Sequence, residues 1–354
     1  MKVFREYKYF PLIVVLMFIS TLISVVYPVE TSYGTTFITT FKRLMQFVTS
    51  FFSYFFFFKY YFETYRVSIN KVYFYSIIYI VIFAFFYFLN SEAYASIKIL
   101  VNPVDNHTRR ALGHEIIYRF NFLWADPNNV AYAVGTLLLT FLSEEQEKYF
   151  SKMLAVVLVI FILFCTMSIG GLSSMIFSLI LFFLFKKKKQ IKTSDFYKIS
   201  ISTIALIFLI IYFYPIISDF FNSDVIDNLL SRVDYYDGSD TSGGRGKDFI
   251  KSLSYLNPMF LSVGCGIEGF VTEIGHMYIL FMYGLPVYIY FIYILFWRKR
   301  SICWRRLIPL IPMFAGFTMN IAIIDQKYLL ILLFTSAYLS ISTSNNQIVN
   351  EKSI

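Results

Sequence analysis

The sequence predicts an all-α polytopic membrane protein with about ten transmembrane helices, both ends cytoplasmic and a large outer loop between spans seven and eight. Of the 354 residues, 58% are hydrophobic and only 15% are charged, whereas a soluble domain is about 45–50% apolar and about 25% charged. Long stretches without Asp, Glu, Lys or Arg recur along the chain, and about 20 such residues cross a bilayer as a helix. This composition excludes a soluble enzyme, a disordered protein and a disulfide scaffold.

The uncharged stretches give the expected spans in chain order. The first is too long for the apolar region of a signal peptide and ends without a cleavage site, so we expect it to remain as a span. The stretches are 9–29, 44–58, 72–91, 127–143, 153–185, 199–218, 274–297, 307–324 and 328–350.

For two stretches, the number of membrane spans that they form is not evident from their length alone. The segment 35–58 is a span only if Lys42 and Arg43 are tolerated, at about 2.5–3.5 kcal/mol each on insertion scales. The run 153–185 has 33 residues, about 50 Å as one helix, and we expect it to form a helical hairpin that turns at Gly170-Gly171. Both assumptions together give ten spans.

The placement of basic residues supports this topology. Segments assigned to the cytoplasmic side hold 20 of the 31 Lys and Arg residues, as the positive-inside rule requires. The two long outer loops, about 90–126 and 219–273, hold four each. An alternative with eight spans drops the segment 35–58 as a span and treats 153–185 as one long helix, which places 90–126 inside. No internal repeat or soluble domain is evident, so residues 1–354 are expected to form a single membrane domain.

The loop 219–273 is the most distinctive polar segment. Its 55 residues include nine acids and four bases, and a loop this long is usually functional. Residues 237–246 read Asp-Gly-Ser-Asp-Thr-Ser-Gly-Gly-Arg-Gly, in which backbone amides can face an anion beside Arg245 and Lys247. The spacing fits neither a Walker A loop nor an EF-hand. The alternative is a flexible solvated turn.

His276 lies where the chain re-enters the membrane after this loop. Histidine is suited to general acid or base catalysis near neutral pH, although a lone histidine at a membrane boundary can also be a simple interfacial residue. His107 and His114 are weaker candidates. The sequence shows no metal-ligand spacing, and its three cysteines define no disulfide framework.

Further basic residues are candidates for binding a polyanion. Lys42 and Arg43 lie in or at the edge of a span, where charges are costly, and a lipid headgroup would be their natural partner. The alternative is that both side chains reach back to water. Arg109, Arg110 and Arg119 form a second basic group in the loop 90–126, where each is individually expected to be a solvated loop charge.

The order of several motifs resembles the O-antigen polymerase and ligase superfamily, in particular the Wzy-type polymerases of O-antigen and capsule assembly. Arg232, followed after ten residues by Gly243, is similar to an Arg-x10-Gly pattern of polymerase loops. Ile169 stands where family members commonly carry an arginine, which puts one phosphate contact in doubt. The matching segments are 126–131 (Asp-Pro-Asn-Asn-Val-Ala), 168–171 (Ser-Ile-Gly-Gly), 242–245 (Ser-Gly-Gly-Arg), 257–258 (Asn-Pro), 264–266 (Gly-Cys-Gly), 276–280 (His-Met-Tyr-Ile-Leu) and Gly284.

This resemblance implies a metal-independent, inverting glycosyl transfer at the outer leaflet of a bacterial inner membrane, without a cofactor. The substrate would be an undecaprenyl-pyrophosphate-linked oligosaccharide, and a chain-length regulator protein would be a partner. Nucleic acid is not expected, despite the net charge of +9. Arg232 and Arg245 would grip the pyrophosphate and His276 would orient or deprotonate the acceptor hydroxyl. The substrate-binding candidates are Lys247, Gly243 and Gly244, with Arg109, Arg110, Lys42 and Arg43 in second rank.

Three other functions compete with this interpretation. An O-antigen ligase shares the donor and the loop with histidine but transfers the chain to lipid A core. A lipid-linked oligosaccharide flippase would more often show internal repeats and charges within several spans. A glycosyltransferase that uses polyprenyl-phosphate sugars would be expected to carry acidic residues in its first outer loop, where residues 30–34 offer only Glu30.

Overall fold

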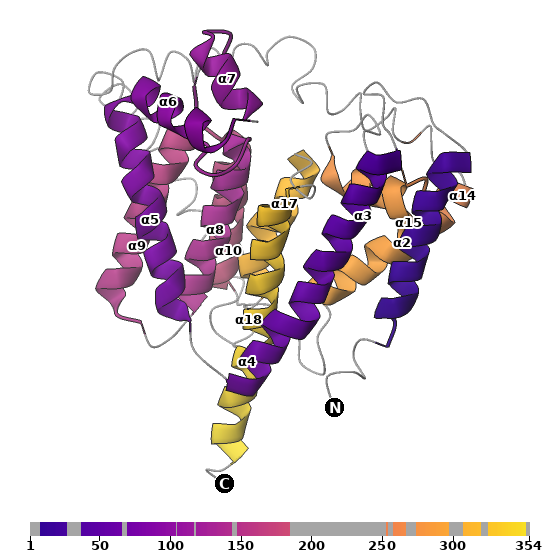
Figure 1. The fold of residues 1–354 in the computed structure, drawn as a ribbon. Helices are drawn as coiled ribbons and strands as arrows, with labels where there is room; N and C mark the ends of the chain where they lie inside the picture. Colours follow the sequence, from indigo (N-terminus) through magenta and orange to yellow (C-terminus); the bar gives the residue numbers. More distant parts are fainter. Residues whose placement is uncertain are drawn as a thin grey trace.

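The computed structural model is a bundle of helices (Figure 1), and the residues that it describes contain no β-strand. The described residues are 8–26, 37–65, 69–103, 105–116, 118–143, 147–184, 253, 258–266, 274–296, 307–319 and 325–351.

Three of the described helices are long and apolar enough to cross a membrane: α5 (Asn70–Leu89), α9 (Tyr149–Thr166) and α15 (Gly275–Phe296). Shorter apolar helices include α2 (Phe10–Val26) and α10 (Ile169–Leu184). Large apolar side chains are exposed along α2, α5 and α9, an arrangement that suits lipid and that a soluble monomer avoids. The all-α prediction is confirmed for the described part of the chain, while the ten spans and their orientation stay predictions.

The segment around Lys42 and Arg43 is helical, as predicted, and longer than expected. It comprises α3 (Phe37–Phe52), a π-helix (Ser53–Lys59) and α4 (Tyr60–Tyr65), and the backbone stays helical across both junctions. Lys42 is exposed, whereas Arg43 is half-buried and donates to Gln46 Oε1 at 2.7 Å.

The helical hairpin predicted for 153–185 is present, which excludes a single long helix there. Its turn lies at Met167 and Ser168, with Met167 at φ +47°, and not at Gly170-Gly171 as expected. The Ser168 hydroxyl accepts from the Gly171 amide at 3.1 Å, so Ser168 caps α10. Gly171 serves packing instead, because a Cβ there would lie 2.2 Å from the Cβ of Ala131 on α8 (Pro127–Ser143).

Gly171→Ala is therefore expected to lower the free energy of unfolding by about 1–3 kcal/mol, since α8 and α10 must move apart to admit the methyl group. Thermal unfolding of the purified protein in detergent measures the effect. Gly113→Ala is the matched control, because a Cβ at Gly113 meets its nearest atom at an ordinary 3.5 Å. An unchanged unfolding midpoint for Gly171→Ala would contradict the close approach.

At the centre of the bundle lies α8 (Pro127–Ser143), whose bounds match the predicted stretch and whose residues are nearly all buried. It packs against α5, α9, α10 and α17 (Ile311–Met319). The short helix Ile308–Leu310 precedes α17, and α18 (Gln326–Glu351) follows it. The start of α2 and the end of α18 lie toward the same end of the bundle (Figure 1).

The predicted outer loop 90–126 is a folded cap rather than an open loop. It contains α6 (Ser91–Val101) and α7 (Asn106–Leu112), and it covers the end of the bundle opposite to Glu351 (Figure 1). The large loop 219–273 is described only at residue 253 and from 258 to 266, where α14 (Pro258–Val263) lies. The candidate residues Arg232, Gly243, Gly244, Arg245 and Lys247 therefore lie outside the described residues.

Candidate functional site

His276 lies in the first turn of α15, and its ring Nδ1 is 3.1 Å from the hydroxyl oxygen of Tyr288. Twelve residues separate the two, which in a straight α-helix is about 18 Å along the axis. They meet because α15 is broken at Gly284, whose backbone has φ +81° and ψ 170°. Such angles are accessible to glycine, and Pro286, which has no amide hydrogen to donate, follows.

A short segment of residues 264–266, which we call the Gly-Cys-Gly strap, docks into this break. The Cys265 amide donates to Phe281 O at 2.7 Å and the Gly266 amide donates to Met282 O at 2.8 Å. The hydroxyl of Ser20 on α2 also donates to Met282 O. These donors satisfy carbonyls that the broken helix leaves without an intrahelical partner, and buried carbonyls need such partners.

The glycines of the strap and of the break are needed for this contact. A Cβ at Gly264 would lie 2.6 Å from Met282 O, and a Cβ at Gly266 would lie 2.1 Å from Ser20 O. A Cβ at Gly284 would lie 2.9 Å from Ser262 O. Two of the family-like motifs, 264–266 and Gly284, are thus parts of one structure that shapes the surroundings of His276.

The other side of the His276 ring faces α17. Its centroid lies 4.6 Å from that of Phe314 and 5.6 Å from that of Phe317, both in edge-on geometry. These rings pack the imidazole without offering side-chain hydrogen bonds. A half-buried imidazole held in this way can accept or return one proton, which is the task of a general base or acid.

Two further family-like motifs meet at the turn between α9 and α10. The Ser168 hydroxyl donates to Asn128 Oδ1 at 2.7 Å, although the residues are 40 apart in sequence. Asp126 holds the start of α8 by accepting from the Asn128 amide at 2.7 Å. Ile169, which stands in the place of the family arginine, is exposed. The segments 126–131 and 168–171 therefore form one contact region.

Arg119 stabilises this turn, so the expectation that it is a solvated loop charge is wrong. The side chain is buried, and its Nε donates to Thr166 O at 2.9 Å. Its Nη2 donates to Met167 O at 3.2 Å and to Asn128 Oδ1 at 3.1 Å. A cation placed on the last carbonyls of α9 satisfies groups that the helix end leaves open and complements the helix dipole.

An open hollow of about 270 Å³ lies where α8, α10 and α17 meet. Ala315 and Thr318 of α17 border it, while Phe314 and Phe317 of the same helix face His276. Successive residues of a helix point in directions about 100° apart, so α17 separates the hollow from the histidine. The lining residues are Tyr132, Gly170, Ser173, Ser174, Phe177, Ala315 and Thr318.

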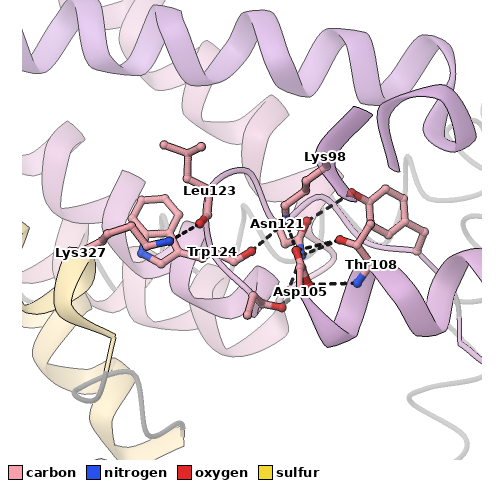
Figure 2. A network of polar contacts seen from close by, with 9 residues as sticks. Lys98, Asp105, Thr108, Asn121, Leu123, Trp124 and Lys327 are labelled. Carbon is pink, nitrogen blue, oxygen red and sulfur yellow. Dashed lines mark hydrogen bonds and ion pairs between the residues drawn. The ribbon is translucent and has the colours of Figure 1, made fainter. Parts of the chain in front are cut away.

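The cap contains a buried polar network (Figure 2). Lys98 Nζ on α6 lies 2.6 Å from Asp105 Oδ2, and the Asp105 side chain is fully buried. Asp105 also caps α7 by accepting from the amide and the hydroxyl of Thr108, at 3.1 and 2.8 Å. The Asn121 amide group donates to Asp105 at 3.1 Å. The carboxylate therefore joins α6, α7 and the segment that leads to α8.

Two lysines from different helices hold neighbouring carbonyls of this segment. Lys98 Nζ donates to Trp124 O at 2.8 Å, and Lys327 Nζ, in the first turn of α18, donates to Leu123 O at 2.6 Å (Figure 2). The cap is thus attached to the start of α18.

Burial and pairing act in opposite directions on the charges of the network. Burial alone would raise the pKa of Asp105, but hydrogen bonds from Lys98 and Thr108 outweigh it and the pKa is lowered. Burial lowers the pKa of Lys98 to about 8, against the opposing effect of Asp105. The 2.6 Å contact between the two groups favours the charged form of both. For Asp325, burial raises the pKa against the nearby charges of Lys327 and Arg43.

The sign of the Asp105 effect gives a pH dependence. A carboxyl group whose pKa is lower in the folded state contributes stability that is complete above its unfolded value of 3.8 and is lost as pH falls through the folded value. The unfolding midpoint in detergent is expected to fall more between pH 7 and pH 3 for the wild type than for Asp105→Asn. Equal decreases in the two proteins would contradict the lowered pKa.

The basic residues predicted to bind substrate lie on different helices. Arg109 and Arg110 are exposed on α7, and Arg110 Nε makes an exposed ion pair with Glu115 at 3.1 Å. Arg43 lies near Asp325, close to the start of α18. Within the described part of the chain, neither Lys42, Arg109 nor Arg110 contacts His276.

Sequence reasoning missed Tyr288 as the partner of His276, the Lys98–Asp105 pair and the attachment through Lys327. A signal existed for Asp105, because aspartate is favoured at a helix N-cap. Across the described residues, no three His, Cys, Asp or Glu side chains could together hold a metal ion. No protein family, no curated protein and no solved structure matches the chain.

Proposed function

We propose that this chain is an outer-leaflet glycosyltransferase of a bacterial inner membrane. It polymerises undecaprenyl-pyrophosphate-linked oligosaccharide repeat units into O-antigen or capsular polysaccharide, and a chain-length regulator protein is its partner in the bilayer. The proposal rests on the order of the family-like motifs, on helices long and apolar enough to cross a membrane and on the surroundings of His276.

The observation that carries the proposal is the position of His276 in a broken helix. The break at Gly284 and the Gly-Cys-Gly strap hold the imidazole against Tyr288 and the aromatic side chains of α17. Broken helices in membrane proteins commonly line substrate sites, because irregular backbone is tolerated there only inside protein or along a cavity. The arrangement offers a proton acceptor beside the loop that we expect to bind the donor.

The reaction is a single displacement in this proposal. The hydroxyl of the acceptor sugar loses its proton to His276 as its oxygen bonds to the anomeric carbon of the growing chain. The bond from that carbon to the pyrophosphate oxygen breaks, and the configuration inverts. Cations stabilise the leaving pyrophosphate, for which we propose Arg232, Arg245 and Lys247 with the amides of Gly243 and Gly244.

Four further cations have a supporting role in this proposal. Arg109 and Arg110 on α7, together with Lys42 and Arg43 on α3, would attract the anionic lipid carrier. The bond between the anomeric carbon and the pyrophosphate supplies the driving force in this proposal, and cationic side chains stabilise the leaving group without a metal ion or a cofactor.

Deletion of the gene tests the function. We expect the surface polysaccharide to collapse on a gel to a single repeat unit on its normal anchor, and a plasmid-borne copy to restore the ladder. Long chains that accumulate on undecaprenyl pyrophosphate would instead identify an O-antigen ligase. Single units trapped on the cytoplasmic leaflet would identify a flippase, and the proposed role of His276 would then be abandoned.

A further inference from the structure

We infer that Tyr288 is a positioning residue for His276, and that the break in α15 serves to bring the two together. The inference rests on the proposed function, because it concerns the base of that reaction. It goes further by assigning the group that sets the orientation and the protonation site of the imidazole.

The contact has the geometry of a hydrogen bond rather than of ring stacking. The Tyr288 oxygen lies 3.1 Å from His276 Nδ1, while the two ring centroids are 6.0 Å apart and the ring planes are inclined at 77°. The hydroxyl thus meets the imidazole at its edge, where the lone pair or hydrogen of Nδ1 lies.

Tyr288 is the side chain that can decide the state of the ring. Phe314 and Phe317 pack against the imidazole but have no hydrogen-bonding side chains. The Phe314 backbone carbonyl is the other polar partner of the ring. Among the described residues that contact the imidazole, Tyr288 is the one with a titratable side chain. Because a neutral imidazole has one N–H and one lone pair, the partner of one nitrogen determines what the other presents.

The break in α15 makes this pairing possible. In an uninterrupted helix the two side chains would start about 18 Å apart along the axis, beyond hydrogen-bonding reach. The Gly-Cys-Gly strap and Ser20 supply donors for Phe281 O and Met282 O, so the break is stabilised from outside the helix. Three chain segments thus maintain the geometry of a single hydrogen bond.

The test uses the purified full-length protein and lipid-linked repeat units, with Tyr288→Phe as the variant. Tyr293→Phe is the matched control, because Tyr293 lies on the same helix, is 40% exposed and has no contact with His276. We expect Tyr288→Phe to lower kcat/KM about tenfold, as for the loss of one hydrogen bond of about 1.4 kcal/mol. The midpoint of its pH–rate profile should also shift, whereas the control keeps both the rate and the midpoint of the wild type.

Each result has one meaning. A wild-type rate and pH profile for Tyr288→Phe, or equal effects of both variants, would overturn the inference. A lower rate with an unchanged pH profile would also overturn it, because that outcome indicates packing alone. If the wild type forms no polymer, or if His276→Ala polymerises normally, the proposed function fails first. Normal unfolding midpoints in detergent verify that both variants fold.

Discussion

Replacing His276 with alanine is expected to lower the rate of repeat-unit polymerisation about 10²- to 10⁴-fold, the usual contribution of a general base. The imidazole contacts Tyr288 and the aromatic side chains of α17, and a positioned histidine is the side chain that most often acts as a general base in enzymes. The rate is measured with purified protein and lipid-linked repeat units, from the polymer ladder formed over time.

His114→Ala is the matched control for this experiment. His114 is exposed on the cap just after α7, so its replacement should leave the polymer ladder unchanged. Comparable losses in the two variants would indicate a general effect on folding or insertion. Full activity of His276→Ala would remove the base from the proposed mechanism, and another proton acceptor would have to be found.

Asp105→Ala is expected to lower the free energy of unfolding by about 3–5 kcal/mol, because it leaves the buried ammonium of Lys98 without its partner. Lys98 is only 7% exposed and Asp105 is fully buried. The same carboxylate caps α7 and accepts from Asn121, so its removal also leaves these donors unpaired. The quantity is measured by equilibrium unfolding in detergent.

The exposed pair of Arg110 and Glu115 supplies the control. These side chains are 58% and 61% exposed, and ion pairs in solvent contribute little to stability, so Glu115→Ala should change the unfolding midpoint little. The double variant Lys98→Met with Asp105→Leu should recover much of the loss, since it removes both charges together. A loss in Asp105→Ala no larger than in Glu115→Ala would show that the cap pair is not structural.

Some of the described helices could be predicted from the sequence because charged residues delimit them. The stretch 127–143 is an example, since Asp126 precedes it, Glu144 follows it and α8 has the predicted bounds. The turn between α9 and α10 was misplaced because a glycine pair marks a turn and a close helix contact equally well. Gly171 serves the contact, and the neighbouring Ser168 makes the turn.

The candidate site depends on contacts that no local pattern encodes. On an ideal helix His276 and Tyr288 point in directions about 120° apart, so the sequence gives no reason to pair them. Pro286 in an apolar run does indicate a kink. The docking of residues 264–266 into that kink is a tertiary contact, which the sequence does not predict. The sequence shows only that residues 264–266 and Gly284 resemble short glycine motifs of a known family.

The attachment of the cap has a consequence for biogenesis. Lys98 and Asp105 are close in sequence, so their pair can form as soon as the first third of the chain has left the ribosome. The hydrogen bond from Lys327 to the Leu123 carbonyl, in contrast, joins residues that are 204 apart and forms only after Lys327 has been made. Likewise, the carbonyl of Met282 meets Ser20 across 262 residues. The early helices therefore remain an incompletely joined set during synthesis, and the bundle closes only when its last described helix has been made.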